Sequence, residues 1–93
     1  MLITISQTKQ LGQVAKLVRK NQGLDQASAG MLSGNGSTFT SEFENGKPTV
    51  ELGRVLNVLN ALGVTLTVDL PIEEESLTKS EQKLLANITH GNE

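Results

Sequence analysis

The side chains that most often perform chemistry in enzymes are sparse in this sequence. It contains no cysteine, which excludes disulfides, thiolate metal sites and cysteine nucleophiles. His90 is the single histidine, and it stands in a polar stretch where a histidine is far more often exposed and inert than catalytic. No group of His, Asp and Glu has the spacing of a metal site, and no glycine-rich phosphate loop follows a strand. We therefore expect no enzymatic activity, no metal and no cofactor.

The residues that favour recognition of another molecule lie between positions 25 and 47. Asp25 is placed to cap one short helix, and a second short helix is expected from Ser37 to Glu44. Ser33-Gly34-Asn35-Gly36 joins them, and two glycines around an asparagine favour a left-handed turn. The pair has the size of a helix-turn-helix. A plain structural hairpin of two helices has the same size, so the spacing alone leaves both interpretations open.

Two longer helices are expected to hold this pair in place. Thr8 can cap the first of them, and Thr49 can cap the last, because Pro48 prevents a helix from continuing through residue 47. Apolar residues recur in each at the spacing of a helix with one buried face. These residues are Leu11, Val14, Ala15 and Val18 in the first helix, and Leu52, Val55, Leu56, Leu59 and Leu62 in the last.

The apolar period changes after Gly63. Val64, Leu66, Val68 and Leu70 alternate with polar residues, which predicts a strand with one apolar face. A lone strand leaves its backbone groups unpaired, so it must pair with residues 2–5 or with its copy in a second subunit. We favour the second subunit. The expected division is a binding and dimerisation domain over residues 1–70 and an acidic extension over residues 71–93.

The acidic extension is expected to be partly disordered or to form a short helix. Thr78 and Glu81 have the spacing of a capping box, which indicates a helix after residue 78. The triplet Glu73-Glu74-Glu75 is interpreted as a solvated spacer, with contact to a basic protein surface as the alternative.

Charge is unevenly distributed along the 93 residues. The net charge of −2 would argue against a nucleic-acid partner. However, residues 1–62 carry six basic and four acidic side chains, whereas residues 63–93 carry two and six. The mildly basic part therefore contains the helix pair. No apolar run approaches the ~20 residues of a membrane span, and no signal-peptide pattern is seen, so we expect a cytoplasmic, nucleoid-associated protein without a membrane partner.

Several short runs resemble those of a known family. Gly23-Leu24-Asp25-Gln26, Gly34 and Phe43-Glu44-Asn45-Gly46-Lys47 resemble the helix-turn-helix of the Cro/phage-repressor superfamily. The run from Glu42 to Thr49 and the helix that follows it are similar to those of the HipB-type repressors, which are the DNA-binding partners of HipA-like kinase toxins. The resemblance covers about residues 6–70.

The resemblance implies a mainly α fold, a small lambda-repressor-like helical bundle followed by a short strand in an intersubunit sheet. It also implies that the helix from Ser37 to Glu44 lies in the major groove of DNA. The residues implied in function are Ser37, Thr38, Ser41 and Glu42 toward the groove; Gln26, Asn45 and Lys47 toward phosphates; Arg19 and Glu44 as a buried structural ion pair; and Val64, Leu66 and Val68 in dimerisation.

The sequence departs from the family pattern at four inward positions. Ala29, Gly30, Asn35 and Thr40 are smaller or more polar than the residues usual there. We expect larger neighbours to fill the space instead, namely Met31, Leu32, Phe39 and Phe43.

The recognition helix also lacks Arg, Lys, Gln and Asn, the side chains that make bidentate base contacts. This predicts a modest-affinity DNA binder or a module whose DNA role has weakened. The function implied by the resemblance is a homodimeric repressor of its own toxin–antitoxin operon, with double-stranded operator DNA and a HipA-like kinase toxin or related toxin component as partners. The alternatives are a toxin-binding interaction module with weak or complex-dependent DNA binding, and a free-standing phage-type repressor.

Overall fold

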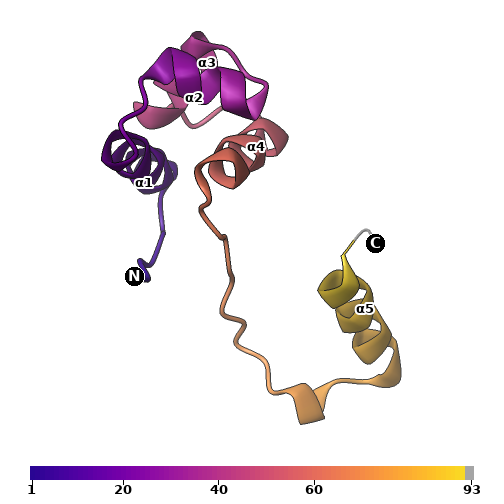
Figure 1. Ribbon diagram of the computed structural model, residues 1–93. Coiled ribbons are helices and arrows are strands. Elements are labelled where there is room, and N and C mark those ends of the chain that lie inside the picture. Colours follow the sequence, from indigo (N-terminus) through magenta and orange to yellow (C-terminus); the bar gives the residue numbers. More distant parts are fainter. Residues whose placement is uncertain (92–93) are drawn as a thin grey trace.

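A computed structural model of the protein describes residues 1–91, and it is almost entirely helical over that range (Figure 1). Four helices gather at one end of the molecule. The chain then leaves them in an extended segment, makes a single 3-10 turn and returns as a separate helix. The elements are α1 (Thr8–Asn21), α2 (Gln26–Ser33), α3 (Ser37–Glu44), α4 (Leu52–Leu62), η1 (Glu74–Ser76) and α5 (Lys79–His90).

The core of the bundle lies between α1, α3 and α4. Phe43 and Leu59 are among its largest fully buried side chains. On α4 the prediction is wrong for Leu52 and Leu56, which are 67% and 38% exposed. The buried stripe instead runs at i, i+3, i+4 and i+7 from Val55 and therefore includes Val58. With so few aromatic residues in the chain, packing rests mainly on aliphatic side chains. The buried cluster consists of Ala15, Phe39, Phe43, Val55, Val58, Leu59 and Leu62, with Leu11, Val18, Leu24, Val50 and Val64 packed against it.

Two glycines allow the helices to approach closely. A Cβ atom on Gly12 of α1 would lie 2.1 Å from the carbonyl oxygen of Phe43 in α3. A Cβ atom on Gly30 of α2 would lie 2.8 Å from the carbonyl oxygen of Asn35. Both distances are far below a van der Waals contact, so α3 reaches its position only because these two residues have no side chain.

Helix starts differ from the sequence prediction at two places. The N-cap of α1 is Gln7 rather than Thr8, and the side chain of Gln10 accepts the backbone N–H of Gln7 at 3.0 Å. The N-cap of α4 is Glu51 rather than Thr49. The helix begins later than predicted because Val50, which follows Thr49, packs against the core in a non-helical conformation. The prediction for α2 is confirmed, since the Asp25 carboxylate accepts the backbone N–H of Ser28 at 2.7 Å.

Residues 64–72, called the arm below, extend away from the bundle (Figure 1). Over residues 1–91 the structure contains no strand, so the pairing of the arm with residues 2–5 of the same chain does not form. In the single chain, the arm and residues 2–5 are therefore both unpaired. Pairing with a second subunit stays a prediction.

Helix α5 follows the arm and begins as the sequence predicts. The side chain of Thr78 accepts the N–H of Glu81, and the Glu81 carboxylate accepts the N–H of Thr78 at 2.9 Å. No residue of α5 is buried. Arm and α5 stretch the molecule to 47 Å along its longest axis, against 26 and 25 Å across. Among the helices within residues 1–91, none combines the length and apolar character needed to cross a bilayer.

Candidate nucleic-acid interface

The link between α2 and α3 is a tight turn that fixes the angle between the two helices. Gly34 ends α2 in the left-handed conformation with φ of +75°, which favours glycine. The N–H of Asn35 then returns to the carbonyl of Gly30 at 2.8 Å. Gly36 caps α3, which begins at Ser37. The predicted helix-turn-helix therefore has the predicted boundaries.

Helix α3 has one face held in the bundle and one face free. The rings of Phe39 and Phe43 stack with centroids 6.3 Å apart, and the Arg54 guanidinium of α4 lies 5.3 Å from the Phe39 centroid. On the opposite face, Ser37 and Thr38 are exposed. Ser41 and Glu42 are half-buried on α3. A row of short hydroxyl side chains is thus presented outward by a helix that the core holds in place.

A buried ion pair anchors the C-terminal end of α3 to α1. The side chains of Arg19 and Glu44 keep only 8% and 2% of their surface exposed. Arg19 donates from Nε and Nη2 to the two carboxylate oxygens at 2.6 and 2.8 Å, and from Nη1 to the carbonyl of Leu24 at 2.8 Å. This is a bidentate, charge-assisted arrangement, and it matches the structural role that the resemblance implied.

Gln26 belongs to the same network. Its Nε2 donates to Glu44 Oε1 at 3.2 Å. Burial by itself would raise the pKa of Glu44, but the hydrogen bonds from Arg19 and Gln26 outweigh it and leave that pKa below its ordinary value. The hydrogen bonds that Arg19 donates to Glu44 in turn raise the pKa of Arg19. Gln26 stands first in α2, so its amide is held at the helix N-terminus while a second N–H remains on the same nitrogen.

The loop after α3 carries the other two residues implied in phosphate contact. Asn45 is exposed, and its side-chain amide donates to Ser41 Oγ at 3.4 Å. Lys47 forms an ion pair with Glu42 in which both side chains are substantially exposed. Both loop residues therefore lie against the outward face of α3. The ammonium group of Lys47 is thus paired with the Glu42 carboxylate of α3.

The four unusual inward positions are accommodated without orphaned polar groups. Thr40 is fully buried, and its hydroxyl donates to the Gly36 carbonyl at 3.2 Å. The Asn35 amide lies 3.3 Å from both Ser33 Oγ and the carbonyl of Arg54. Within residues 1–91, every buried side-chain nitrogen or oxygen has a hydrogen-bond partner.

The expected compensation is correct for one pair of residues and wrong for the other. Phe39 and Phe43 fill the core, whereas Met31 and Leu32 remain 82% and 62% exposed. The reason is the close approach at Gly30, because the backbone of residues 35 and 36 itself closes the space beside α2. Side chains larger than hydrogen at residue 30 would have pushed that backbone away.

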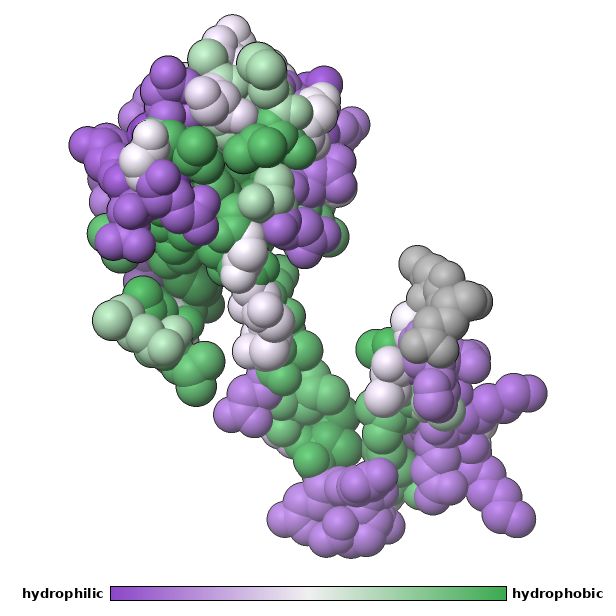
Figure 2. All heavy atoms as spheres, viewed as in Figure 1, coloured by the Kyte–Doolittle hydropathy of each residue, from purple (hydrophilic) through white to green (hydrophobic). Residues whose placement is uncertain are grey.

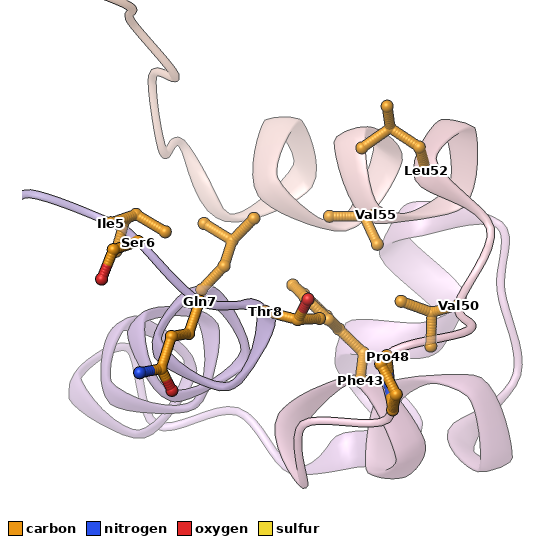
Figure 3. Close-up of a pocket in the computed structure, with 10 residues that line it drawn as sticks. Ile5, Ser6, Gln7, Thr8, Phe43, Pro48, Val50, Leu52 and Val55 are labelled. Atoms are coloured by element: carbon orange, nitrogen blue, oxygen red, sulfur yellow. The ribbon is translucent and has the colours of Figure 1, made fainter.

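An apolar cleft of about 330 Å³ lies on another side of the bundle, between the segment before α1 and the start of α4 (Figure 3). Its polar lining residues are uncharged, namely Ser6, Gln7 and Thr8. Among residues 1–91 there is also no group of three His, Asp or Glu side chains placed to hold a metal ion. None of the residues that line the cleft carries an ionisable side chain.

The residues implied in dimerisation lie where the chain leaves the bundle and along the arm, and only Val64 packs against the core. Val64 is half-buried where the arm begins, while Leu66 and Val68 are 49% and 79% exposed along it. Two contacts of the interface had no sequence signal that singled them out, namely Arg54 over Phe39 and the Asn35 amide on the Arg54 carbonyl. Both join residues of separate helices or loops.

Four packed helices with an exposed third helix after a glycine turn define a helix-turn-helix domain. No family model matches the chain. It is 38% identical over 63 residues to y4mF of Sinorhizobium fredii, an uncharacterized HTH-type transcriptional regulator, and the match covers 68% of this chain and 83% of that protein. The chain belongs to this family of helix-turn-helix transcriptional regulators.

Solved structures narrow the fold to the HipB type. A HipB variant in complex with an O2 20mer is matched with a TM-score of 0.70 and 26% identity, over 77% of this chain and 100% of that one. A HipA-HipB-O2-O3 complex contains a chain matched with a TM-score of 0.69 and 25% identity, over 76% of this chain and 100% of that one.

Proposed function

We propose that the protein is a sequence-specific DNA-binding repressor that reads its operator with α3. The observation that carries this proposal is the row of outward hydroxyl groups on Ser37, Thr38 and Ser41. The helix that presents them is fixed by Phe39 and Phe43 on its other face. Hydroxyl groups can hydrogen-bond any base edge in the major groove, so they give readout with modest discrimination. The HipB chain matched in full is in complex with a 20mer, which supports the same orientation of α3.

Contacts to the DNA backbone are assigned to the residues around α3. The Gln26 amide is held at the N-terminus of α2 by Glu44 and has a second N–H to offer a phosphate. Asn45 and Lys47 lie beside the same face, in the loop after α3. Glu42 sits among these donors. To contact a phosphate, the Lys47 ammonium either breaks its ion pair with Glu42 or binds the carboxylate and the phosphate together.

The active unit is a homodimer joined through the arm. Val64, Leu66 and Val68 lie on the alternating apolar positions of a segment that has no strand partner within residues 1–91 of its own chain. Pairing with the same segment of a second copy would satisfy those backbone groups. Two recognition helices would then read half-sites about one helical turn apart.

The biological role is that of the antitoxin and autoregulator of a HipBA-like operon. The matched chain of the HipA-HipB-O2-O3 complex supports this assignment, because it is covered in full by the present fold. The partners are the operator DNA and a HipA-like kinase toxin or related toxin component. A repressor of this kind acts on chromosomal DNA in the cytoplasm.

A mobility-shift titration against the DNA upstream of the gene tests the repressor function. The parent chain should give a specific shift that weakens as salt rises. Replacement of Ser37, Thr38 and Ser41 by alanine should weaken specific binding about 10-fold or more. The matched control replaces the exposed Ser76 of the 3-10 turn by alanine and should leave the shift unchanged. Absence of a specific shift at low salt would rule out the proposal.

A second candidate is a toxin-binding module that binds DNA weakly or only within a complex. The ion pair between Glu42 and Lys47 favours it, because the pair occupies a cation that would otherwise be available to a phosphate. Titration with and without the product of a neighbouring kinase-like gene separates the two functions. A DNA shift that needs that protein supports the module, and absence of such a neighbour supports a free-standing phage-type repressor.

A further inference from the structure

The arm has unpaired backbone groups and exposed apolar side chains. Between residues 65 and 72, the described chain supplies no hydrogen-bond partner for the arm backbone. Its apolar residues Leu66, Val68 and Leu70 are about half exposed or more. Pairing with the arm of a second copy would satisfy the backbone groups, but a two-stranded ribbon alone is marginally stable in water. One face of such a ribbon must be covered by a further element.

Helix α5 has an apolar face that no other element within residues 1–91 buries. It is 12 residues long, a length at which an isolated helix is marginal, and none of its residues is buried. Leu84 and Ile88 are 58% and 68% exposed on one face, with Leu85 beside them. In Figure 2 the apolar surface of α5 forms a column on the side that faces the apolar arm. The capping box shows that the start of this helix is specified locally, so what it lacks is a surface to pack against.

The fold similarity leaves part of this chain unmatched. The HipB chain in complex with the 20mer is covered in full by 77% of this chain. The remaining 23% corresponds to about 21 of 93 residues, the length of residues 73–93. The matched share, about 72 residues, is shorter than the span from Thr8 to His90, so the match cannot include all of α1 to α5.

The exposed area of the chain has the size that a second copy would cover. The chain exposes 7,084 Å², whereas a compact monomer of its mass exposes about 5,200 Å². The surplus is about 1,900 Å² in each chain, or about 3,800 Å² for two, which lies within the range of obligate homodimer interfaces.

We propose that α5 packs on the apolar face of the ribbon that the arm forms with the arm of a second copy, which makes α5 a dimerisation element. The second copy is the occupant because the missing strand and the missing apolar surface are both copies of what the chain itself exposes. The acidic triplet at residues 73–75 and the lysines at 79 and 83 stay in water in this arrangement. The inference rests on the homodimer of the proposed function and adds the element that stabilises it.

The test is the dimer dissociation constant of the full chain, measured by sedimentation over a dilution series. Leu84→Gln combined with Ile88→Gln should weaken dimerisation at least about 10-fold, since two buried apolar side chains become polar. The matched control, Lys83→Gln with Asn87→Gln on another face of α5, should leave it within about 2-fold. Circular dichroism and the melting curve of the bundle check that both variants remain folded.

Hydrogen exchange supplies a second measurement that does not depend on a variant. In the parent chain, amides of residues 79–90 should be protected in a concentration-dependent manner, because only the dimer packs α5. Fast exchange of α5 at concentrations where the chain is dimeric overturns the inference. An unchanged dissociation constant in the Leu84 and Ile88 variant also overturns it, as does a parent chain that is monomeric at about 100 μM. A dimer that depends on α5 but gives no specific DNA shift instead supports this inference and removes the repressor function.

Discussion

Arg19 and Glu44 meet in the interior of the bundle as a two-pronged pair, with Nε–Oε2 and Nη2–Oε1 distances of 2.6 and 2.8 Å. The pair joins the last turn of α1 to the last residue of α3. Glu44 also accepts the amide of Gln26, so one carboxylate fixes the relative positions of three helices. The orientation of α3 is therefore set in part by a contact on its buried face.

Removal of either partner should destabilise the protein strongly. Glu44→Gln and Arg19→Met should each lower the free energy of unfolding by about 3–5 kcal/mol, because each leaves a buried group without its counterpart. Urea denaturation followed by circular dichroism measures this. Glu51→Gln is the matched control, since the Glu51–Arg54 pair is exposed and should contribute at most about 1 kcal/mol. Equal effects of Glu44→Gln and Glu51→Gln would contradict the structural role of the buried pair.

The same carboxylate predicts how stability changes with acidity. The pKa of Glu44 lies below its ordinary value of 4.5 in the folded chain. The unfolded chain therefore binds more protons just below that pH, and the free energy of unfolding should fall as pH falls through the folded pKa. Above pH 4.5 the contribution is fully present. Denaturant midpoints between about pH 3 and 7 measure it, and Glu44→Gln should have a flatter profile.

Part of that profile should remain in the Glu44→Gln variant. The backbone N–H of Ser28 donates to Asp25 and lowers the pKa of that carboxyl as well. Asp25→Asn retains a capping oxygen but does not titrate, so it separates the two contributions. If the variant at residue 44 keeps the full acid dependence of the parent, the assignment to Glu44 is wrong.

Two glycine substitutions should have opposite effects. Gly12→Ala would force a Cβ against the Phe43 carbonyl and should cost about 1–3 kcal/mol or more. Gly53→Ala in α4 meets open space and should stabilise the chain by about 0.5–1 kcal/mol. Thermal melts of the two variants provide the comparison. A neutral Gly12→Ala would mean that α1 and α3 are not in contact at that point.

Capping and turn residues in the sequence predict the ends of some helices correctly but not those of others. The limits of α3 follow from Gly36 before it and Asn45-Gly46 after it, and both limits are found in the structure. The start of α4 could not be predicted from Thr49, because the tertiary contact of Val50 with the core decides it. The capping preference of a single residue is a local free energy of about 1 kcal/mol, which such a contact exceeds.

The sequence pattern also does not predict which residues of α2 face inward. A short helix with Ala29, Gly30, Met31 and Leu32 in succession has an apolar residue at every angle. Which of them face inward depends on the backbone of residues 35–36, which approaches Gly30. The Gln26–Glu44 hydrogen bond spans 18 positions and has no periodicity to reveal it. The family resemblance, by contrast, placed Arg19 opposite Glu44 because it carries long-range information that a single pattern lacks.

The ion pair on the outer face of α3 yields a prediction about DNA affinity. Lys47→Met should reduce the salt dependence of operator binding by about one phosphate contact and weaken all sequences alike. Glu42→Gln should strengthen non-specific binding, because a carboxylate beside the phosphates is removed and Lys47 is released. Fluorescence anisotropy across a salt series measures both. Lys83→Met on α5 serves as the charge-matched control, and an equal slope change there would assign the effect to net charge alone.

If the chain is the repressor proposed above, the pairing of Lys47 with Glu42 also affects how quickly it finds its operator. A cation that is already occupied holds random DNA weakly, so the residence time at each wrong position is short. A regulator that releases wrong positions quickly examines more of the chromosome in a given time. The hydroxyl groups of α3 then need to discriminate only during brief encounters, and the second recognition helix of a dimer would lengthen the one encounter that fits.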